Sequence, residues 1–327
     1  MASLLVYGAI NWDTSCFVEH MPVPGEEVTI KHITRVSGGT GGNVAVAAAR
    51  ILGANEVALI AALGQDDIAR QQIAALDDEG VITEGIDLIQ REESGQAYIF
   101  INQEGQNVIA SHLGANARLC VEHVNKPQRR QQLQECKGIV LTDPPLDVAM
   151  ELISLARKHG ISVLWDPGIL VSPNREALQS LAKQVDVLFL NETEANALLG
   201  TDELTISLQR LQELGFSNHV VLKLGAQGAA VVESSTGVVS EITALPLNDL
   251  DLSVINTVGC GDAFVGVFAA YRVLKYSLQQ SLIMASTAAG INATRPETRG
   301  SPVRASLEEV EQRSRGTGFT VRERKLT

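Results

Sequence analysis

Short apolar runs alternate with amphipathic or alanine-rich stretches along most of the chain. Runs that are apolar throughout predict strands covered on both faces, as in a parallel sheet between layers of helices. The predicted strands are residues 4–10, 57–63, 138–142, 161–166, 185–190, 219–224 and 228–233. The predicted helices are residues 42–52, 67–79, 147–159, 192–199, 205–214, 261–276 and 279–293. The pattern predicts an α/β fold, a three-layer sandwich in which helices flank a central, mainly parallel sheet.

Two segments depart from this alternation. Residues 14–36 and 95–113 alternate apolar with polar side chains and contain the turn signals PVPGEE and NQEGQN. Such alternation predicts strands with one buried and one solvated face, so we expect a small β-sheet lid over one end of the α/β body. No charged or low-complexity block divides residues 1–327, which favours a single domain with this lid inserted. An apolar outer face on the lid also favours a homodimer.

Composition and charge restrict the partners. Of the 327 residues 45% are hydrophobic, enough for a large core, and the net charge of -12 argues against nucleic acid or an anionic membrane as a partner. The only basic cluster is the tail VRERKLT (residues 321–327), which we expect to be a solvated end.

The cysteine pattern and the N-terminal sequence bear on the cellular location of the protein. The first apolar run starts at Leu4, too directly for a signal peptide, and no apolar stretch free of turn residues reaches membrane-spanning length. The six histidines show no metal-binding pattern, so we expect no structural metal. We expect a reducing, cytoplasmic location because no pair spacing links the cysteines, which are Cys16, Cys120, Cys136 and Cys260.

A glycine-rich stretch, SGGTGGNVAVAAARILG (residues 37–53), precedes a predicted helix with little charge. Glycines let a backbone approach a bound molecule closely, and Asn43 at the helix start is suited either to bind a ligand hydroxyl or to cap the first turn. The stretch lacks the Gly-Lys-Ser/Thr of a Walker loop and the G-x-G-x-x-G spacing of a dinucleotide-binding turn.

The stretch NTVGCGDAFVGVF (residues 256–268) is better suited to bind phosphate. The amides of Gly259, Cys260 and Gly261 can converge on an anion at the positive end of the helix that follows. Asp262 has two interpretations. A capping carboxylate would contribute about 0.5 to 2 kcal/mol, whereas a carboxylate beside an anion cradle is what phosphoryl transfer to an alcohol requires, because it accepts the hydroxyl proton. The flanking glycines favour the second interpretation.

Together these stretches resemble the signature regions of the ribokinase-like (PfkB) family of carbohydrate and nucleoside kinases. The first matches G-G-x-G-x-N at Gly38, Gly39, Gly41 and Asn43, and NTVGCGD matches D-T-x-G-A-G-D. Further pieces match in order along almost the whole chain; they are GAINWD (8–13), the segment 95–116, NETEANALLG (191–200) and LGAQG (224–228).

The resemblance implies that Asp262 is the catalytic base and that the amides of Gly259, Cys260 and Gly261 form an anion hole. It also implies a sugar site in which Asp13 holds hydroxyls near the reacting carbon; taken alone, Asp13 is an ordinary acid at a strand end. The other residues implied for the sugar site are Asn11, Gly39, Gly42 and Asn43.

For the nucleotide, the resemblance implies that Asn191 and Glu194 organise Mg²⁺, held by Glu194 through water, around the phosphates of ATP. Their spacing alone favours a helix N-cap with a capping-box glutamate. Gly225 and Gly228 would form a turn against the nucleotide. Residues 294–302 would close over the adenine and seat a monovalent cation such as K⁺.

Several residues depart from the family pattern. Asn256 replaces the usual Asp, so a potassium site there should be weakened. Cys260 replaces Ala; a helix N-terminus lowers a thiol's pKa, so this residue is either open to oxidation or a passive small side chain. Lys223 replaces a frequent Thr and either meets a phosphate or points into solvent. Asp143 lies near where ribokinases place a Glu against the sugar.

The acceptor is inferred from the lid. A hexose-phosphate kinase would need a basic cluster for its second phosphate, and the lid contains only Lys31 and Arg35. A nucleoside kinase would need aromatic surface, which Phe17, Tyr98 and Phe100 supply if they point inward. We expect ATP- and Mg²⁺-dependent phosphorylation of a primary hydroxyl of ribose or a similar pentose. The alternatives are a ribonucleoside kinase and a catalytically silent sugar or nucleotide sensor.

Overall fold

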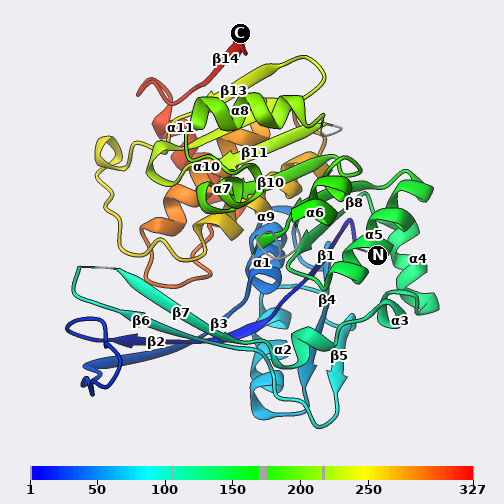
Figure 1. The fold of residues 1–327 in the computed structure, drawn as a ribbon, viewed down its shortest axis with the longest axis vertical. Coiled ribbons are helices and arrows are strands. Elements are labelled where there is room, and N and C mark those ends of the chain that lie inside the picture. The colour runs from blue at the N-terminus through cyan, green and yellow to red at the C-terminus, as the bar shows by residue number, and fades with distance from the viewer. Residues whose placement is uncertain (1, 105, 169–174, 216–217, 327) are drawn as a thin grey trace.

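The structure, a computed structural model, describes residues 2–104, 106–168, 175–215 and 218–326. Gly105 of the second predicted lid segment and Thr327 of the tail therefore lie outside the described residues. The strands form a ten-stranded sheet and a separate four-stranded sheet. Figure 1 shows the small sheet projecting from one side of the larger α/β body.

The large sheet has the strand order β14-β13-β12-β11-β10-β9-β8-β1-β4-β5. Its strands are β1 (Leu4–Gly8), β4 (Val57–Gly64), β5 (Ile86–Ile89), β8 (Gly138–Thr142), β9 (Ser162–Asp166), β10 (Val187–Asn191), β11 (His219–Lys223), β12 (Ala229–Glu233), β13 (Val238–Ile242) and β14 (Val321–Lys325). Neighbouring strands from β5 to β11 pair in parallel, and those from β11 to β14 pair antiparallel. The sheet is thus mainly parallel, as predicted.

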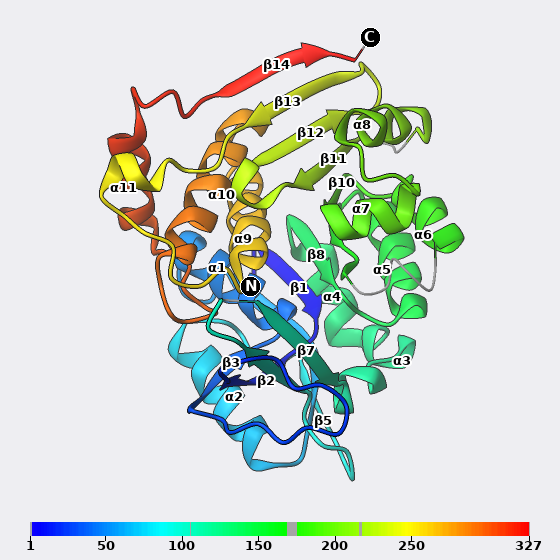
Figure 2. The same ribbon diagram turned by 60° about the vertical axis from the view of Figure 1, so that its left-hand side comes forward.

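Helices cover both faces of this sheet (Figures 1 and 2). They are α1 (Thr40–Leu52), α2 (Asp67–Asp78), α3 (Val121–Val124), α4 (Pro127–Glu135), α5 (Leu146–His159), α6 (Arg175–Ala182), α7 (Glu192–Leu199), α8 (Leu204–Glu213), α9 (Cys260–Val273), α10 (Leu278–Ala293) and α11 (Arg304–Ser314). Alternate residues of β1 point into different cores: Leu4 and Val6 pack with α1, α9 and α10, whereas Leu5 and Tyr7 pack with α5. This alternation produces the three layers.

Some elements were not predicted from the sequence; these are β5, β13, β14, α3, α4, α6 and α11. The prediction of a solvated tail was wrong, because Val321–Lys325 pairs with β13 as an edge strand. Its side chains are mostly exposed, and an exposed edge strand needs no apolar pattern to be held by backbone hydrogen bonds. Helix α4 is similarly polar and buries only Arg129 and Leu133.

The small sheet has the order β3-β2-β6-β7 and contains β2 (Asn11–Phe17), β3 (His32–Gly38), β6 (Gln96–Ile101) and β7 (Asn107–His112). Strand β2 begins soon after β1 ends, so the sheet starts at the carboxyl edge of the large sheet. Asn11 and Asp13 share the face that contains Phe17. The pairing register places Ile33, Tyr98 and Val108 on the opposite face, where their side chains are 39%, 42% and 58% exposed.

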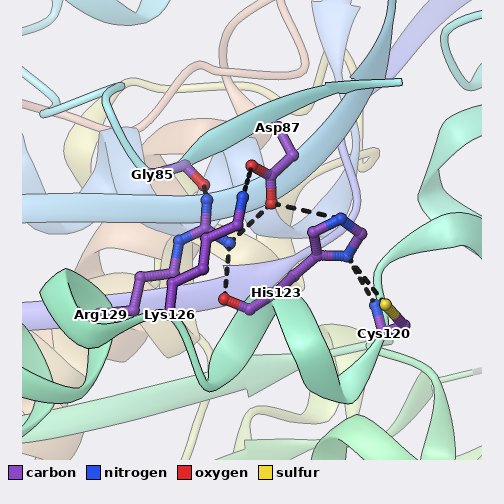
Figure 3. A network of polar contacts seen from close by, with 6 residues as sticks. All are labelled: Gly85, Asp87, Cys120, His123, Lys126 and Arg129. Carbon is purple, nitrogen blue, oxygen red and sulfur yellow. Dashed lines mark hydrogen bonds and ion pairs between the residues drawn. The ribbon is translucent and has the colours of Figure 1, made fainter. Parts of the chain in front are cut away.

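A network of charged groups attaches α3 and α4 to β5 (Figure 3). Asp87 of β5 forms ion pairs with Arg129 at 2.7 Å and Lys126 at 2.5 Å, and Arg129 also donates to the carbonyl oxygen of Gly85 at 2.8 Å. His123 Nδ1 accepts from the amide of Cys120 at 3.1 Å and so caps the short helix α3. These contacts hold two polar helices against the end strand of the sheet.

The four cysteines are free thiols. Of the helices described, none combines the length and apolar character needed to cross a bilayer. Across the described ranges, the His, Cys, Asp and Glu side chains form no group of three or more that could hold a metal ion.

Candidate active site

Polar residues gather where the parallel strands end. Asp166, Asn191 and Lys223 are the last residues of β9, β10 and β11, and Asp143 follows β8 directly. These strands are neighbours, so their carboxyl ends lie at the same edge of the sheet, where open α/β sheets bind ligands.

Helix α9 presents Asp262 at this edge. Phe268 packs edge-on against Phe189 of β10, with ring centroids 5.3 Å apart, and so fixes the helix on the sheet. At Gly266 a Cβ would lie 2.5 Å from the carbonyl oxygen of Val44, so glycine permits close packing of α9 against α1. This close packing sets Asp262 beside Asn43 of α1.

Asp262 does not cap its own helix. The N-cap is Gly259, in the left-handed conformation at φ 80°, and no side chain caps this end. Instead, Asp262 Oδ2 accepts a hydrogen bond from Asn43 Nδ2 at 2.7 Å, and Oδ1 has no hydrogen-bond partner among the described residues. Burial raises the pKa of Asp262 to about 6, although the bond from Asn43 opposes the rise.

The start of α9 also presents backbone amides. The first α-helical hydrogen bond runs from the amide of Ala263 to the carbonyl oxygen of Gly259 at 2.9 Å. The amides of Gly261 and Asp262 come before it and therefore have no acceptor within the helix. The amide of Cys260 makes a long turn hydrogen bond of 3.4 Å to the carbonyl oxygen of Thr257.

The expectation of a lowered pKa for the Cys260 thiol was wrong. Burial raises this pKa to about 11, so the side chain is a neutral thiol at neutral pH.

Asn43 is not the helix cap considered from the sequence. Helix α1 begins at Thr40 with Gly39 as N-cap, so Asn43 lies one turn inside, with 6% of its surface exposed. Its Oδ1 accepts from Arg299 Nε at 3.0 Å while its Nδ2 donates to Asp262. The Asn43 side chain is thus aimed at the site and not at the helix end.

Asp13 lies on the small sheet and is 6% exposed. Burial raises the pKa of its carboxyl group to about 7, with Arg299 lowering it and Asp262 raising it. A Cβ at Gly38 would lie 1.9 Å from Asp13 Oδ2, so this carboxylate fits against the glycine-rich turn. Asn11 Oδ1 accepts from Asn116 Nδ2 at 2.9 Å, which fixes its amide.

Lys223 and Asp166, at the ends of β11 and β9, form an ion pair at the same edge of the sheet. Lys223 Nζ donates to Asp166 Oδ2 at 2.5 Å, and the lysine side chain is 15% exposed, so the solvent-facing alternative for Lys223 was wrong. Burial alone would lower the pKa of Lys223, but Asp166 and Glu194 reverse the effect and raise it. A Cβ at Gly261 would lie 3.7 Å from Lys223 Nζ, which places the ammonium near the start of α9.

Asp143 is partly buried and has a left-handed backbone conformation, at φ 52°. Its Oδ2 accepts from Thr40 Oγ1 at 3.0 Å, whereas Oδ1 is buried and has no hydrogen-bond partner in the part of the chain that the structure describes. Burial and then the nearby Asp166 raise its pKa to about 7. An orphaned buried oxygen of this kind is suited to a ligand hydroxyl.

Asn191 and Glu194 form a reciprocal capping box at the start of α7. The Glu194 amide donates to Asn191 Oδ1 at 2.8 Å, and the Asn191 amide donates to Glu194 Oε2 at 2.8 Å. Asn191 Nδ2 also donates to Glu194 Oε1 at 2.7 Å. Burial raises the pKa of Glu194, and Asp166 adds to the rise.

The remaining predicted residues lie farther along the edge. Gly225 begins the short 3-10 helix after β11, at φ 54°, and Gly228, at φ 101°, closes it against Ile242 and Thr243. Asn256 Nδ2 donates to the Pro296 carbonyl oxygen at 2.9 Å, and its Oδ1 accepts from the Val258 amide at 3.0 Å. Within the described chain, no hydrogen bond or ion pair joins Gly225, Gly228 or Asn256 to the acids around Asp262.

The sequence did not single out Asp166 or Arg299. Asp166 ends a predicted strand, so the rule that ligands bind at carboxyl ends could have found it. Arg299 lies in the segment 294–302, in which no periodic pattern shows that its side chain turns inward. Its contacts to α1 cross 256 positions of sequence.

The fold recurs in solved structures. The Arabidopsis thaliana ribokinase, solved with ribose and ATP, superposes with a TM-score of 0.83 at 25% identity and covers 95% of this chain and 99% of that chain. A ribokinase from Cryptococcus neoformans, solved with ADP, gives a TM-score of 0.82 at 25% identity over 94% of this chain and 99% of that chain. The class of fold is therefore that of ribokinases.

Sequence comparison gives the family. The deoxyribokinase of Salmonella typhi is 29% identical over 304 residues, covering 91% of this chain and 94% of the relative. The ribokinase of Haemophilus influenzae is 29% identical with the same coverage. The pfkB family carbohydrate kinase model matches residues 1–304, and the chain belongs to this family. It is a phosphotransferase with an alcohol group as acceptor, as the sequence predicted.

Proposed function

We propose that this protein transfers the γ-phosphoryl group of ATP to a primary hydroxyl of ribose or a similar pentose. The single observation that carries the proposal is the state of Asp262. Its carboxylate is fixed through Oδ2 by Asn43, does not cap its helix, and keeps Oδ1 without a partner among the described residues. That oxygen is available to a ligand hydroxyl.

Asp262 acts as the general base. With a pKa of about 6, it is mostly ionised at neutral pH and accepts the proton as the sugar oxygen attacks phosphorus. The amides at the start of α9, from Gly259 through Gly261, stabilise charge on the transferred group, with a weaker contribution from Cys260 because its amide is partly engaged.

The sugar lies between the small sheet and the glycine-rich turn. Asp13 and Asn11 present polar groups from β2, and Asp143 presents its orphaned Oδ1 from the edge of the large sheet. Gly39, Gly42 and Asn43 line the turn. Such convergent polar groups suit a polyol, whose hydroxyls both donate and accept.

The nucleotide lies along the ends of β10 and β11. Lys223 is released from Asp166 to contact a phosphate, and Gly225 and Gly228 lie against the nucleotide. Glu194, with Asn191 beside it, would hold Mg²⁺ through water. The donor set supports this fit, because Mg²⁺ keeps several waters and binds few carboxylates besides phosphate. When bound there, Mg²⁺ would supply charge neutralisation at the phosphates. Asn256 offers no carboxylate, so we expect weak K⁺ activation.

A pentose as acceptor is supported by the two relatives reported above, one named a deoxyribokinase and the other a ribokinase. A ribonucleoside kinase has less support, because Tyr98 and Phe100 lie on the face of the small sheet opposite Asp13. Only Phe17 shares the Asp13 face, and its ring packs against His32 at 5.6 Å. The silent sensor is disfavoured by the intact Asp262 site.

An ADP-release assay tests the function. The acceptors are ribose, 2-deoxyribose, ribose 1-phosphate, ribonucleosides, fructose and 2-keto-3-deoxygluconate, each with and without potassium. We expect the highest kcat/KM with ribose or deoxyribose and little effect of potassium. Preference for a nucleoside or a sugar phosphate would overturn the acceptor, and no ADP release with any acceptor would support the sensor.

We further propose that the protein is cytoplasmic, in keeping with its free cysteines, and forms a homodimer through the exposed face of the small sheet. Ile33, Tyr98 and Val108 give that face its exposed apolar side chains.

A further inference from the structure

Arg299 lies in the loop between α10 and α11, and its side chain reaches the glycine-rich turn. Its Nε donates to Asn43 Oδ1 at 3.0 Å. Its Nη2 donates to the Gly38 carbonyl oxygen at 3.1 Å and to Gln72 Oε1 at 3.4 Å. The guanidinium is therefore fixed by several acceptors from different elements.

Packing against Gly42 and a hydrogen bond from Arg50 hold Arg299 in one position. A Cβ at Gly42 would lie 2.5 Å from Arg299 Nη2, so the guanidinium packs directly on the turn because position 42 has no side chain. Behind the loop, Arg50 Nη1 donates to the Arg299 carbonyl oxygen at 2.8 Å, and Arg50 is itself paired with Glu79. The loop cannot move outward without breaking these bonds.

Arg299 determines which way the Asn43 amide faces. A carboxamide has an acceptor end and a donor end, and only one orientation satisfies both neighbours here. With Oδ1 held by Arg299, Nδ2 must face Asp262, where it donates to Oδ2 at 2.7 Å. The reversed amide would direct an oxygen at a carboxylate and an NH₂ group at a guanidinium, both of which are repulsive.

We propose that Arg299 is a positioning residue for phosphoryl transfer, which acts through Asn43 to hold the Asp262 carboxylate in its catalytic orientation. This inference rests on the proposed role of Asp262 as the base. It concerns a residue that lies outside both signature stretches and does not itself need to touch the sugar or the nucleotide.

The charge of Arg299 has a second effect. Burial lowers its pKa to about 10, which leaves it protonated at neutral pH, and its charge favours the ionised forms of Asp13 and Asp262. The other charged or titratable groups that face Asp262 are Asp166 of β9, Lys223 of β11, Asp13 of β2, Asp143 after β8, Glu194 of α7 and Cys260 of α9. Removal of Arg299 should raise the pKa of Asp262.

The test measures pH profiles of kcat and of KM for both substrates. Arg299→Gln should lower kcat by about 10- to 100-fold, since misplacement by about 1 Å can cost that much. KM for ATP should change little, and the acid limb of the kcat profile should move to higher pH. Arg299→Lys should keep the acid limb near its wild-type position but recover kcat only in part, because an ammonium lacks the planar fork.

A double-mutant cycle separates positioning from general support of the fold. If Arg299 acts through Asn43, Asn43→Ala combined with Arg299→Lys should lower kcat no more than Asn43→Ala alone. Additive losses, or a lower melting temperature with an unchanged kcat and pH profile, would overturn the proposal. Should Arg299→Gln not fold, Arg299→Lys and its double mutant still decide the matter.

Controls separate this inference from the proposed function. Arg304→Gln removes the same charge from an exposed i, i+4 pair with Glu308 on α11 and should leave both profiles unchanged. Asp262→Asn is assayed with the same substrates. If Asp262→Asn retains turnover, the base is wrong and the function fails; if it loses turnover while the Arg299 variants behave like the wild type, only the role of Arg299 fails.

Discussion

At the scale of single residues, the pKa of Asp262 fixes how the reaction depends on pH. Because its pKa is raised to about 6, the carboxyl group is protonated below that pH and cannot accept the hydroxyl proton. We expect kcat to rise about tenfold per pH unit below about pH 6 and to level off above it. Steady-state rates at saturating substrates, measured from about pH 5 to about pH 8.5, would contradict this if they were flat.

Asp143 should destabilise the free protein at neutral pH. Its folded pKa of about 7 lies above the ordinary value of 3.8, so the folded state favours the protonated carboxyl, and stability falls as the pH rises between these values. Asp143→Asn removes the charge, and asparagine tolerates a positive φ. We expect a higher melting temperature for the variant at pH 8 and little change at pH 4, by calorimetry. Equal shifts at both pH values would be inconsistent with this cause.

The site residues differ in how visible they were in the sequence. The motif glycines and Asp262 stand out because helix starts and anion cradles need particular residues at fixed spacing. The bond between Asn43 and Asp262 spans 219 positions, and that between Arg299 and Asn43 spans 256, so local patterns carry no sign of either. Asn43 was accordingly considered as a cap, although it lies inside α1.

At the scale of elements, strands buried on both faces were predictable, because apolar runs are what two covering layers require. Edge elements were not. Strand β14 and helix α4 are polar, and they are held by backbone pairing and by ion pairs that only the assembled fold creates.

The network of Figure 3 gives a stability prediction. Burial would raise the pKa of Asp87, but Arg129 and Lys126 outweigh it and lower the pKa, so its stabilisation is present above about pH 4 and is lost as the pH falls through the folded value. At neutral pH, Asp87→Asn should cost about 3 to 5 kcal/mol, because the buried Arg129 keeps its carbonyl acceptors but loses the carboxylate that balances its charge.

A matched control for this network is the exposed pair of Glu241 and Arg324, whose side chains are 39% and 45% exposed. Glu241→Gln should cost about 0 to 1 kcal/mol. Urea unfolding at pH 7 compares the two variants. Equal losses would mean that the Asp87 network is no more than a solvated surface contact.

At the scale of the whole molecule, the small sheet connects the site to subunit contacts. One face carries Asp13, and the other exposes Val108 and its apolar neighbours. We expect a sedimentation mass near twice the 35.0 kDa chain mass, and Val108→Arg should shift it toward the monomer. Ser111→Arg, which adds a charge at an exposed position of β7 on the opposite face of the small sheet, is the control. A wild-type monomer would contradict the proposed dimer.

The most direct test of the central claim is the turnover of Asp262→Asn with the best pentose acceptor, with sugar and nucleotide binding measured by calorimetry. Loss of the base, with the amide still able to accept from Asn43, should lower kcat by about 10²- to 10⁴-fold and leave both dissociation constants within a few-fold of the wild type. Wild-type turnover in this variant would contradict the assignment of Asp262 as the group that accepts the hydroxyl proton.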